Sequence, residues 1–401
     1  MLLSAGFSRI TQTLLAVSSG YQNLCNQALL SSSPSPPSSA SASSFISPPP
    51  DTMPSSLSSR LARLLCAGAA VQVACAQLSS ALNITIYQPN ATLAPSPLPP
   101  PGSSSAGAEI IRQLTQVTRS TAWTLVDSVP FEGDTFEPEG ILRLGPDRYV
   151  VSAGEYTVPT KKYFSNGTYV NGTDRTAGAG FAHLIVFDGG GRRVADATLT
   201  RAGAEEYHNG GLDYDGEHIW AAVAQYRPNT TAQLVRVDPA TLEPETVLRA
   251  ADHLGGVVHD VASGRLVALN WGSRAASTFD LRYRYAPAPE FSAPQAVVNN
   301  PSSWSDYQDC KYLGASAAYD WRSVMLCSGI ASLYNTSIGG LAIVDVRTMV
   351  PLWEVPLTMV SGAGNLVTKN PMDVAVVDGR VRLYFLPDER NSTLYVYEPE
   401  L

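Results

Sequence analysis

Short runs that alternate hydrophobic and polar residues recur along the chain, and each pair of runs is separated by a turn. The clearest case is His208 to Ala224, in which Asp215-Gly216 separates Gly-Leu-Asp-Tyr from His-Ile-Trp-Ala-Ala-Val. An Asp-Gly pair between two β-prone runs predicts a β-hairpin. Related patterns occur at residues 139–152, 208–224, 253–269, 309–327 and 372–385.

Further strands are expected after each hairpin. A third apolar run follows and usually ends in Asp, as in Leu184-Ile185-Val186-Phe187-Asp188, and a fourth run follows a turn, as in residues 239–248 and 349–357. A repeated unit of four antiparallel strands is typical of a β-propeller blade.

The ends of the repeat indicate how the ring closes. The last copy stops at Leu401 before a fourth strand, whereas residues 122–129 form an extra strand before the first copy. We therefore predict an all-β fold, a single β-propeller of five blades in which the N-terminal strand completes the last blade. Six blades are the alternative if residues 281–305 contain another. An immunoglobulin-like sandwich would not explain the repeat.

The residues before the repeat divide into three regions of different composition. Residues 1–52 contain a Ser/Pro/Ala tract and are interpreted as disordered or as a mis-annotated leader, with translation starting at Met53. Residues 53–76 have the basic, apolar and small-residue order of a signal peptide, a buried apolar segment being the alternative. Residues 77–120 are interpreted as a Pro/Ser-rich linker with a short helix near 108–117, and residues 121–401 as the propeller.

Composition narrows the range of partners. The 401 residues carry a formal net charge of −8 with only 27 Lys and Arg, so the sequence lacks the excess of basic residues that nucleic-acid binding requires. We therefore expect no nucleic-acid partner. No apolar run of membrane-spanning length follows residue 77. We expect a secreted monomer that binds a small molecule.

Export is also indicated by glycosylation motifs and cysteines. Cys310 and Cys327 are the two cysteines beyond the leader, and the hairpin places them side by side, which predicts a disulfide; two free thiols are the alternative. Seven Asn-x-Ser/Thr motifs predict N-glycans, most of them on the rim that surrounds the polar ring described next: Asn83, Asn90, Asn166, Asn171, Asn229, Asn335 and Asn391.

Polar residues occupy the positions where the first strand of each blade begins and the second ends. Because neighbouring strands are antiparallel, these positions should meet near the propeller axis. The expected catalytic group is Glu139, His208, His253 and Asp309; the expected ligand-binding group is Trp271, Arg274, Arg227, Arg390 and Glu155; the expected metal ligands are Glu139, Asn209 and Asp373. Gln225, Asn270, Ser328 and Asp388 should lie close by.

A purely structural role is the alternative at each of these positions. Polar axial residues can simply be solvated, and Asp309 and Asp373 can bind backbone N–H groups. His183 and His218 are expected to be packing residues, and His259 is ambiguous.

Several stretches resemble a family of secreted β-propeller-like proteins filed as a domain of unknown function, number 6454. They include 134–141, 152–156, 171–180, 207–211 and 270–274, within a resemblance that covers roughly residues 120 to 400. This resemblance implies no activity. More loosely, Pro-Glu-Gly-Ile and Asn-Gly-Gly-Leu-Asp-Tyr-Asp-Gly are similar to metal-binding segments of gluconolactonase-type calcium propellers, which implies that Glu139, Asn209 and Asp373 bind a divalent cation, with calcium expected. His208 and His253 suit calcium poorly.

Two hypotheses about function follow. The first is metal-dependent hydrolysis of a small sugar-like or lactone substrate, with Asp309 or Glu139 as base and a histidine assisting proton transfer. The second is a non-catalytic extracellular propeller that binds a small ligand. A purely structural role for the ring is the third alternative.

Overall fold

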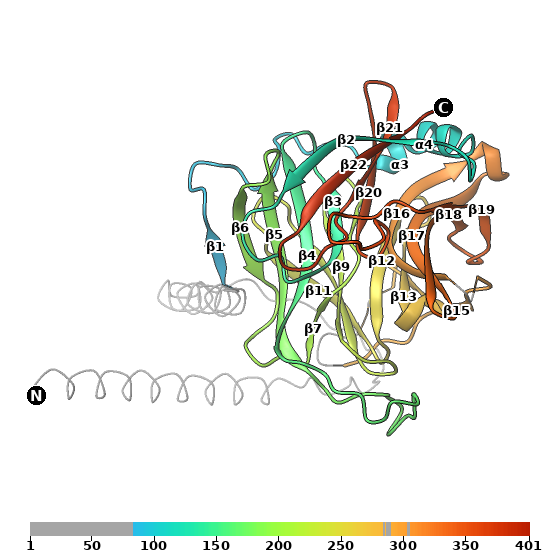
Figure 1. Cartoon of the computed structure of the whole chain (residues 1–401). Helices are drawn as coiled ribbons and strands as arrows, with labels where there is room; N and C mark the ends of the chain where they lie inside the picture. The colour runs from blue at the N-terminus through green and yellow to red at the C-terminus, as the bar shows by residue number, and fades with distance from the viewer. Residues whose placement is uncertain (1–82, 284, 286–289, 303–304) are drawn as a thin grey trace, which may run out of the picture. The chain divides into compact units, whose positions relative to one another are not determined.

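Five antiparallel sheets follow one another along the chain and form the blades of a β-propeller (Figure 1). The structure is a computed structural model and describes residues 83–401 except 284, 286–289 and 303–304. The predicted leader (1–52) and signal peptide (53–76) lie outside the described residues.

The strands of each blade run from the axis outwards in a simple order. Blade 1 contains β3 (Glu137–Arg143), β4 (Arg148–Val158), β5 (Ala179–Asp188) and β6 (Arg193–Thr198). Blade 2 contains β7 (Glu206–Asn209), β9 (Ile219–Gln225), β10 (Ala232–Val237) and β11 (Pro244–Ala250), with the short β8 (Asp213–Tyr214) also paired to β9. Blade 3 contains β12 (Leu254–Asp260), β13 (Arg265–Asn270), β14 (Ala275–Asp280) and β15 (Ala296–Asn299).

The last two blades complete the predicted five. Blade 4 contains β16 (Ser305–Ser316), β17 (Arg322–Leu333), β18 (Thr336–Asp345) and β19 (Pro351–Leu357). Blade 5 contains β20 (Met372–Val377), β21 (Arg380–Phe385), β22 (Thr393–Pro399) and, as its outer strand, β2 (Trp123–Pro130). β2 pairs antiparallel with β22, as predicted for closure by the N-terminal strand. The described residues of the segment 281–305 supply β15 to blade 3, so the described chain has the five predicted blades and not the alternative six.

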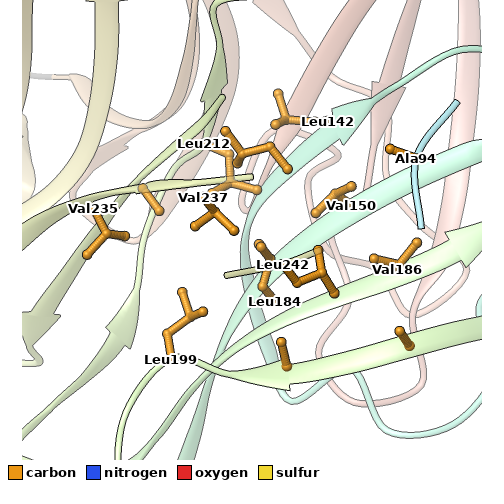
Figure 2. Close-up of a cluster of buried hydrophobic side chains, with 14 of the residues drawn as sticks. Ala94, Leu142, Val150, Leu184, Val186, Leu199, Leu212, Val235, Val237 and Leu242 are labelled. Atoms are coloured by element: carbon orange, nitrogen blue, oxygen red, sulfur yellow. The ribbon is translucent and has the colours of Figure 1, made fainter. Parts of the chain in front are cut away.

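Contacts between successive blades close the ring. β7 contacts β4 and β5, β12 contacts β9, β16 contacts β12, and β20 contacts both β16 and β3. Five clusters of buried hydrophobic residues occupy the five junctions between blades. Figure 2 shows the first junction, where Leu142, Leu184 and Val186 of blade 1 lie near Leu212 and Val237 of blade 2. Because a blade is covered on both faces, side chains on both sides of its strands are apolar.

The recurring Asp at the end of the third strand has a local structural cause. Oδ1 of Asp188, Asp238, Asp280 and Asp345 accepts a backbone N–H from two residues further on. This Asx-type bond turns the chain from the third strand into the fourth. The Asp that recurs at the end of the third strand in the sequence repeat therefore forms the turn into the fourth strand.

The segment expected to be a linker is packed on the propeller over its described part. β1 (Ile84–Ile86) pairs with β6 and adds a fifth strand to blade 1. The short helix α3 (Gly102–Ser105) precedes α4 (Gly107–Leu114), and Ile110, Ile111 and Leu114 join the core between blades 4 and 5. The short helix expected near 108–117 is present as α4. The linker interpretation rested on the Pro and Ser content of the segment and did not include the packing of the apolar face of this helix.

The two cysteines form the predicted disulfide. Cys310 in β16 lies directly opposite Cys327 in β17, with their Cα atoms 4.1 Å apart. The prediction is confirmed because the register of a hairpin is local and determines which residues face each other.

Candidate functional site

A cavity of about 180 Å³ lies at the axial ends of blades 1 to 4. It is smaller than the ~300–1,000 Å³ usual for drug-sized ligands, so a ligand that fills it must be small. Its polar lining includes Glu139, His208, His253, Asp306 and Asp309. The structure therefore brings together all four residues expected to be catalytic, each from the first strand of a blade or the residue just before it.

Glu139 and His208 meet across the junction of blades 1 and 2. Nε2 of His208 lies 3.4 Å from Oε1 of Glu139, and both side chains are nearly buried. A carboxylate oxygen only accepts, so this geometry favours the tautomer of His208 that carries its proton on Nε2. Nδ1 of His208 is buried and has no hydrogen-bond partner among the described residues.

His253 is held in a neutral form. Its Nδ1 donates to the carbonyl oxygen of Gln225 at 2.7 Å, which leaves Nε2 as an acceptor. Burial, helped by neighbouring His208, lowers the pKa of His253 to about 3. A Cβ at Gly255 would lie 3.0 Å from Nε2 of His253, so glycine keeps the approach to that nitrogen open.

An aromatic wall forms one side of the cavity. The ring of His208 stacks on Tyr226 at 5.1 Å, and the indole of Trp271 meets His253 edge to face at 4.8 Å. The guanidinium of Arg175 lies 4.7 Å from the centre of the Trp271 ring and is paired with the carboxylate of Asp174. Arg175 belongs to the long connection between β4 and β5, drawn in green in Figure 1. This cation–π contact with Arg175 helps to hold the ring of Trp271 in place.

Asp309 lies at the inner end of the cavity and has a clear structural role. Its Oδ2 accepts backbone N–H groups of Ile141 in blade 1 and Met372 in blade 5, both at 3.3 Å, and lies 2.8 Å from Nζ of Lys311. Nζ of Lys311 in turn donates to the carbonyl oxygen of Leu212 in blade 2. Burial raises the pKa of Asp309 to about 7, against the effect of Lys311. One ion pair thus ties four blades together at the axis.

The three expected calcium ligands do not converge. Asn209 follows His208 and points to the other side of its strand, where Nδ2 donates to the carbonyl oxygen of His183 at 2.7 Å. Oδ2 of Asp373 accepts the N–H of Arg143, which lies four residues, about 13 Å of strand, beyond Glu139. Within the described ranges no group of three His, Cys, Asp or Glu residues is placed to hold a metal ion. The residues do not fit calcium as a set, and calcium stays a prediction.

The residues expected to bind a ligand separate into two groups. Trp271 lines the cavity, and Arg274 follows Ser273 beside it, donating to the carbonyl oxygens of Gly272 and Ser305. The other three are paired elsewhere: Arg227 with Glu205, Arg390 with Asp134, and Glu155 with His183. Of the neighbouring positions, Asn270 lines the cavity, whereas Asp388 accepts hydrogen bonds from Ser361 and Asn365.

Two of the remaining histidines also contact carboxylates. His183 lies between Asp196 and Glu155, at 2.8 and 3.1 Å, and stacks on Phe136. His259 lies 2.9 Å from Asp215. Both are structural positions, as expected for His183.

Sequence reasoning missed several residues of the cavity. Tyr226, Asp306 and Gln308 were not singled out, although Tyr226 directly follows the expected position Gln225. Arg175, which contacts the ring of Trp271, was not singled out either. For Asp306 the available signal was the length of the strand. β16 begins at Ser305, so Asp306 is the residue at its mouth and Asp309 lies deeper.

The asparagines of all seven glycosylation motifs are exposed in the structure. Five of them lie in connections between the second and third strands of blades 1, 2, 4 and 5, at the end where the first strand begins: Asn166, Asn171, Asn229, Asn335 and Asn391. In the part of the chain that the structure describes, no helix is long and apolar enough to cross a membrane.

Three solved structures are similar to the chain at low identity. A luciferin-regenerating enzyme is 8% identical over 70% of this chain and 95% of its own, with a TM-score of 0.37. A mannose phosphorylase from Leishmania mexicana is 12% identical over 68% and 88%, with a TM-score of 0.39. Hydrazine synthase from Kuenenia stuttgartiensis is 10% identical over 47% and 58%, with a TM-score of 0.27.

No curated protein sequence matches the chain. Residues 98–401, most of the chain and all five inner strands of the propeller, match the model of the family described as a family of unknown function, DUF6454, and the protein belongs to that family.

Proposed function

We propose that the axial cavity binds a small sugar-like substrate and hydrolyses a bond in it, with Glu139 as the general base. The observation that carries the proposal is the contact between Glu139 and His208 inside a small cavity with an aromatic wall. A carboxylate held by an imidazole can accept a proton from a water molecule positioned beside it.

The lining of the cavity favours a hydroxylated ligand. Sugar hydroxyls donate and accept hydrogen bonds, and Glu139, His253, Asn270 and Gln308 supply acceptors and donors around the space. The aromatic faces of Tyr226 and Trp271 supply apolar surface for the C–H groups of a sugar ring. A site of this size accommodates one small unit and not a polymer.

Each residue has a distinct part in the proposed reaction. Glu139 takes the proton of the attacking water, and His208, whose Nε2 lies 3.4 Å from Oε1 of Glu139, keeps the carboxylate in place. Neutral His253 accepts a substrate hydroxyl through Nε2, because its Nδ1 proton is committed to Gln225. Asp309, the other base considered, is engaged with Lys311 and two backbone N–H groups, which leaves Glu139 as the base.

Binding without catalysis is the second candidate function. Nδ1 of His208 is buried without a partner in the described structure, so the imidazole has no second group to exchange a proton with. This observation favours a fixed hydrogen-bond donor over a proton shuttle. In that case the same cavity recognises a small hydroxylated ligand and releases it unchanged.

Hydrolysis is tested with a panel of 4-nitrophenyl glycosides and simple lactones. We expect the wild type to release product from at least one probe and Glu139→Gln to lower kcat/KM at least ~100-fold, as for loss of a general base. Asp320→Asn, an exposed substitution at the far end of the β16–β17 hairpin, is the control. Binding of the free sugars by calorimetry without turnover of any probe would favour the second candidate.

Chelation separates the acid–base route from the calcium-dependent one. The acid–base route predicts unchanged turnover in excess EDTA. Loss of turnover in EDTA that added calcium restores would favour the cation that the sequence resemblance implies.

We also propose that the protein is secreted and carries N-glycans at the rim of the cavity. The proposal is supported by the exposure of the asparagine in each of the seven motifs and by the Cys310–Cys327 disulfide, which is typical of oxidising compartments. Expression in a eukaryotic secretory host followed by peptide-N-glycosidase digestion should reduce the mass of the protein from the medium. N-terminal sequencing should find a start near Gln77, and a mature chain that retains residues before Met53 would contradict the proposed leader.

A further inference from the structure

Asp306 is a carboxyl group of the axial cavity in addition to Glu139 and Asp309, and neither the repeat nor the family resemblance points to it. It lies at the mouth of blade 4, one residue after the start of β16, and lines the same space as Glu139. Glu139 comes from blade 1, so the two carboxyl groups approach the cavity from blades that are not neighbours in the ring.

The surroundings of Asp306 favour its protonated form more than those of an ordinary aspartate. Burial raises the pKa of Asp306 to about 6, and the charge of Glu139 acts in the same direction. Arg274 and a hydrogen bond with the side chain of Gln308 oppose this rise. Asp306 therefore exchanges its proton close to neutral pH, where a general acid is most effective.

Cleavage of a glycosidic bond needs one group that gives a proton to the leaving oxygen and one that takes a proton from water, and a pair of carboxyl groups can supply both. We propose that Asp306 is the proton donor of the hydrolysis proposed above, on which this inference rests, and that the bond cleaved is a glycosidic bond to an unactivated alcohol. Asp306 then serves the leaving group, and Glu139 serves the water.

The chemistry balances without a further reactant. The oxygen of water forms a bond to the anomeric carbon as its proton moves to Glu139. The bond between the anomeric carbon and the leaving oxygen breaks, the electron pair goes to that oxygen, and the oxygen takes the proton of Asp306. The products are the free sugar and the alcohol, and proton exchange with solvent restores both carboxyl groups.

The assignment is tested by comparing leaving groups on one sugar. For the sugar that the wild type hydrolyses, Asp306→Asn is assayed on the 4-nitrophenyl glycoside, whose leaving group needs no proton, and on the methyl glycoside, whose leaving group does. We expect a loss of at least ~100-fold in kcat on the methyl glycoside and of less than ~10-fold on the 4-nitrophenyl glycoside. The alkaline fall in the pH profile of the wild type should be absent from the variant.

The controls keep the two proposals distinguishable. Glu139→Gln should lose activity on both glycosides, and Asp320→Asn should retain both. Equal losses of Asp306→Asn on the two glycosides, or an unchanged rate on the methyl glycoside, would overturn the role of Asp306 while leaving hydrolysis intact. A wild type that turns over lactones but no glycoside would overturn the glycosidic assignment alone, and a wild type inactive on every probe would overturn both proposals.

Discussion

Nζ of Lys311 lies 2.8 Å from Oδ2 of Asp309, and both groups are buried at the centre of the propeller. The pair also binds backbone groups of Ile141, Leu212 and Met372. Other axial carboxylates act similarly: Asp213 accepts the N–H of His259, and Asp373 accepts that of Arg143. Polar residues near the axis thus hold inner strands of different blades in register.

Replacing only Asp309 or only Lys311 should lower the free energy of unfolding more than replacing both residues together. Asp309→Asn leaves the ammonium of Lys311 without its counter-charge, so we expect a loss of about 3–5 kcal/mol in the free energy of unfolding, and a similar loss for Lys311→Met. The double variant should lose less than the sum of the two. Urea denaturation measures all three, and the exposed Lys369–Glu389 pair, expected to couple by less than ~1 kcal/mol, is the control cycle. Additive losses of stability for Asp309→Asn and Lys311→Met would contradict the expected coupling within this ion pair.

The site histidines allow a purely structural role to be tested. His208→Asn removes the imidazole that contacts Glu139, and we expect kcat/KM on the best hydrolysed probe to fall at least ~10-fold per folded molecule. His253→Asn should act mainly on KM, because His253 is proposed to accept a substrate hydroxyl. Circular dichroism and thermal melting check folding. Variants that lose only stability, with turnover per folded molecule unchanged, would support the structural alternative.

His183 should make stability depend on pH. Burial lowers the pKa of His183, but its bonds with Asp196 and Glu155 outweigh burial, and the net pKa is raised. Its contribution is therefore fully present below the unfolded value of about 6.5 and is lost as pH rises through the folded pKa. His183→Gln should flatten the fall in urea midpoint between pH 6 and 9. His218→Gln, at a half-buried turn, should keep the wild-type slope; identical slopes for wild type and His183→Gln would refute the prediction.

The segment before the propeller should contribute to its stability. Ile111 of α4 is buried between blades 4 and 5, so Ile111→Ala is expected to cost about 2–4 kcal/mol in unfolding free energy. Arg112→Ala, one residue along and exposed, should change stability by less than ~1 kcal/mol. Thermal or urea unfolding of both variants makes the comparison. Equal, small effects would mean that the segment is a linker after all.

Features that depend on neighbouring residues could be predicted from the sequence. The hairpins, the Asp turns and the pairing of Cys310 with Cys327 follow from local alternation and hairpin register. The use of residues 122–129 to complete blade 5 followed from the strand missing at one end of the repeat and the extra strand at the other. The same logic brought Glu139, His208 and His253 to one cavity, because each stands where the first strand of a blade begins.

Depth along the axis could not be predicted in this way. Asp373 is the second residue of β20, yet it lies level with Arg143 and not with Glu139, because contacts between blades determine how far each inner strand is displaced along the axis. A bulge in β16 likewise leaves Asp306 at the mouth and Asp309 at the floor. The repeat pattern carries no information on either displacement.

The sequence by itself therefore determined the blade, the number of blades and the closure of the ring, since these depend on residues close together in the chain or on complete strands. The tertiary structure alone decided which polar residues meet, that Asn209 turns away from His208 towards blade 1, that Asp309 and Lys311 bind backbone groups of other blades, and that Arg175 and α4 pack on the propeller. Those outcomes depend on packing between residues far apart in the chain, where a shift of one residue along a strand moves a side chain to the opposite face.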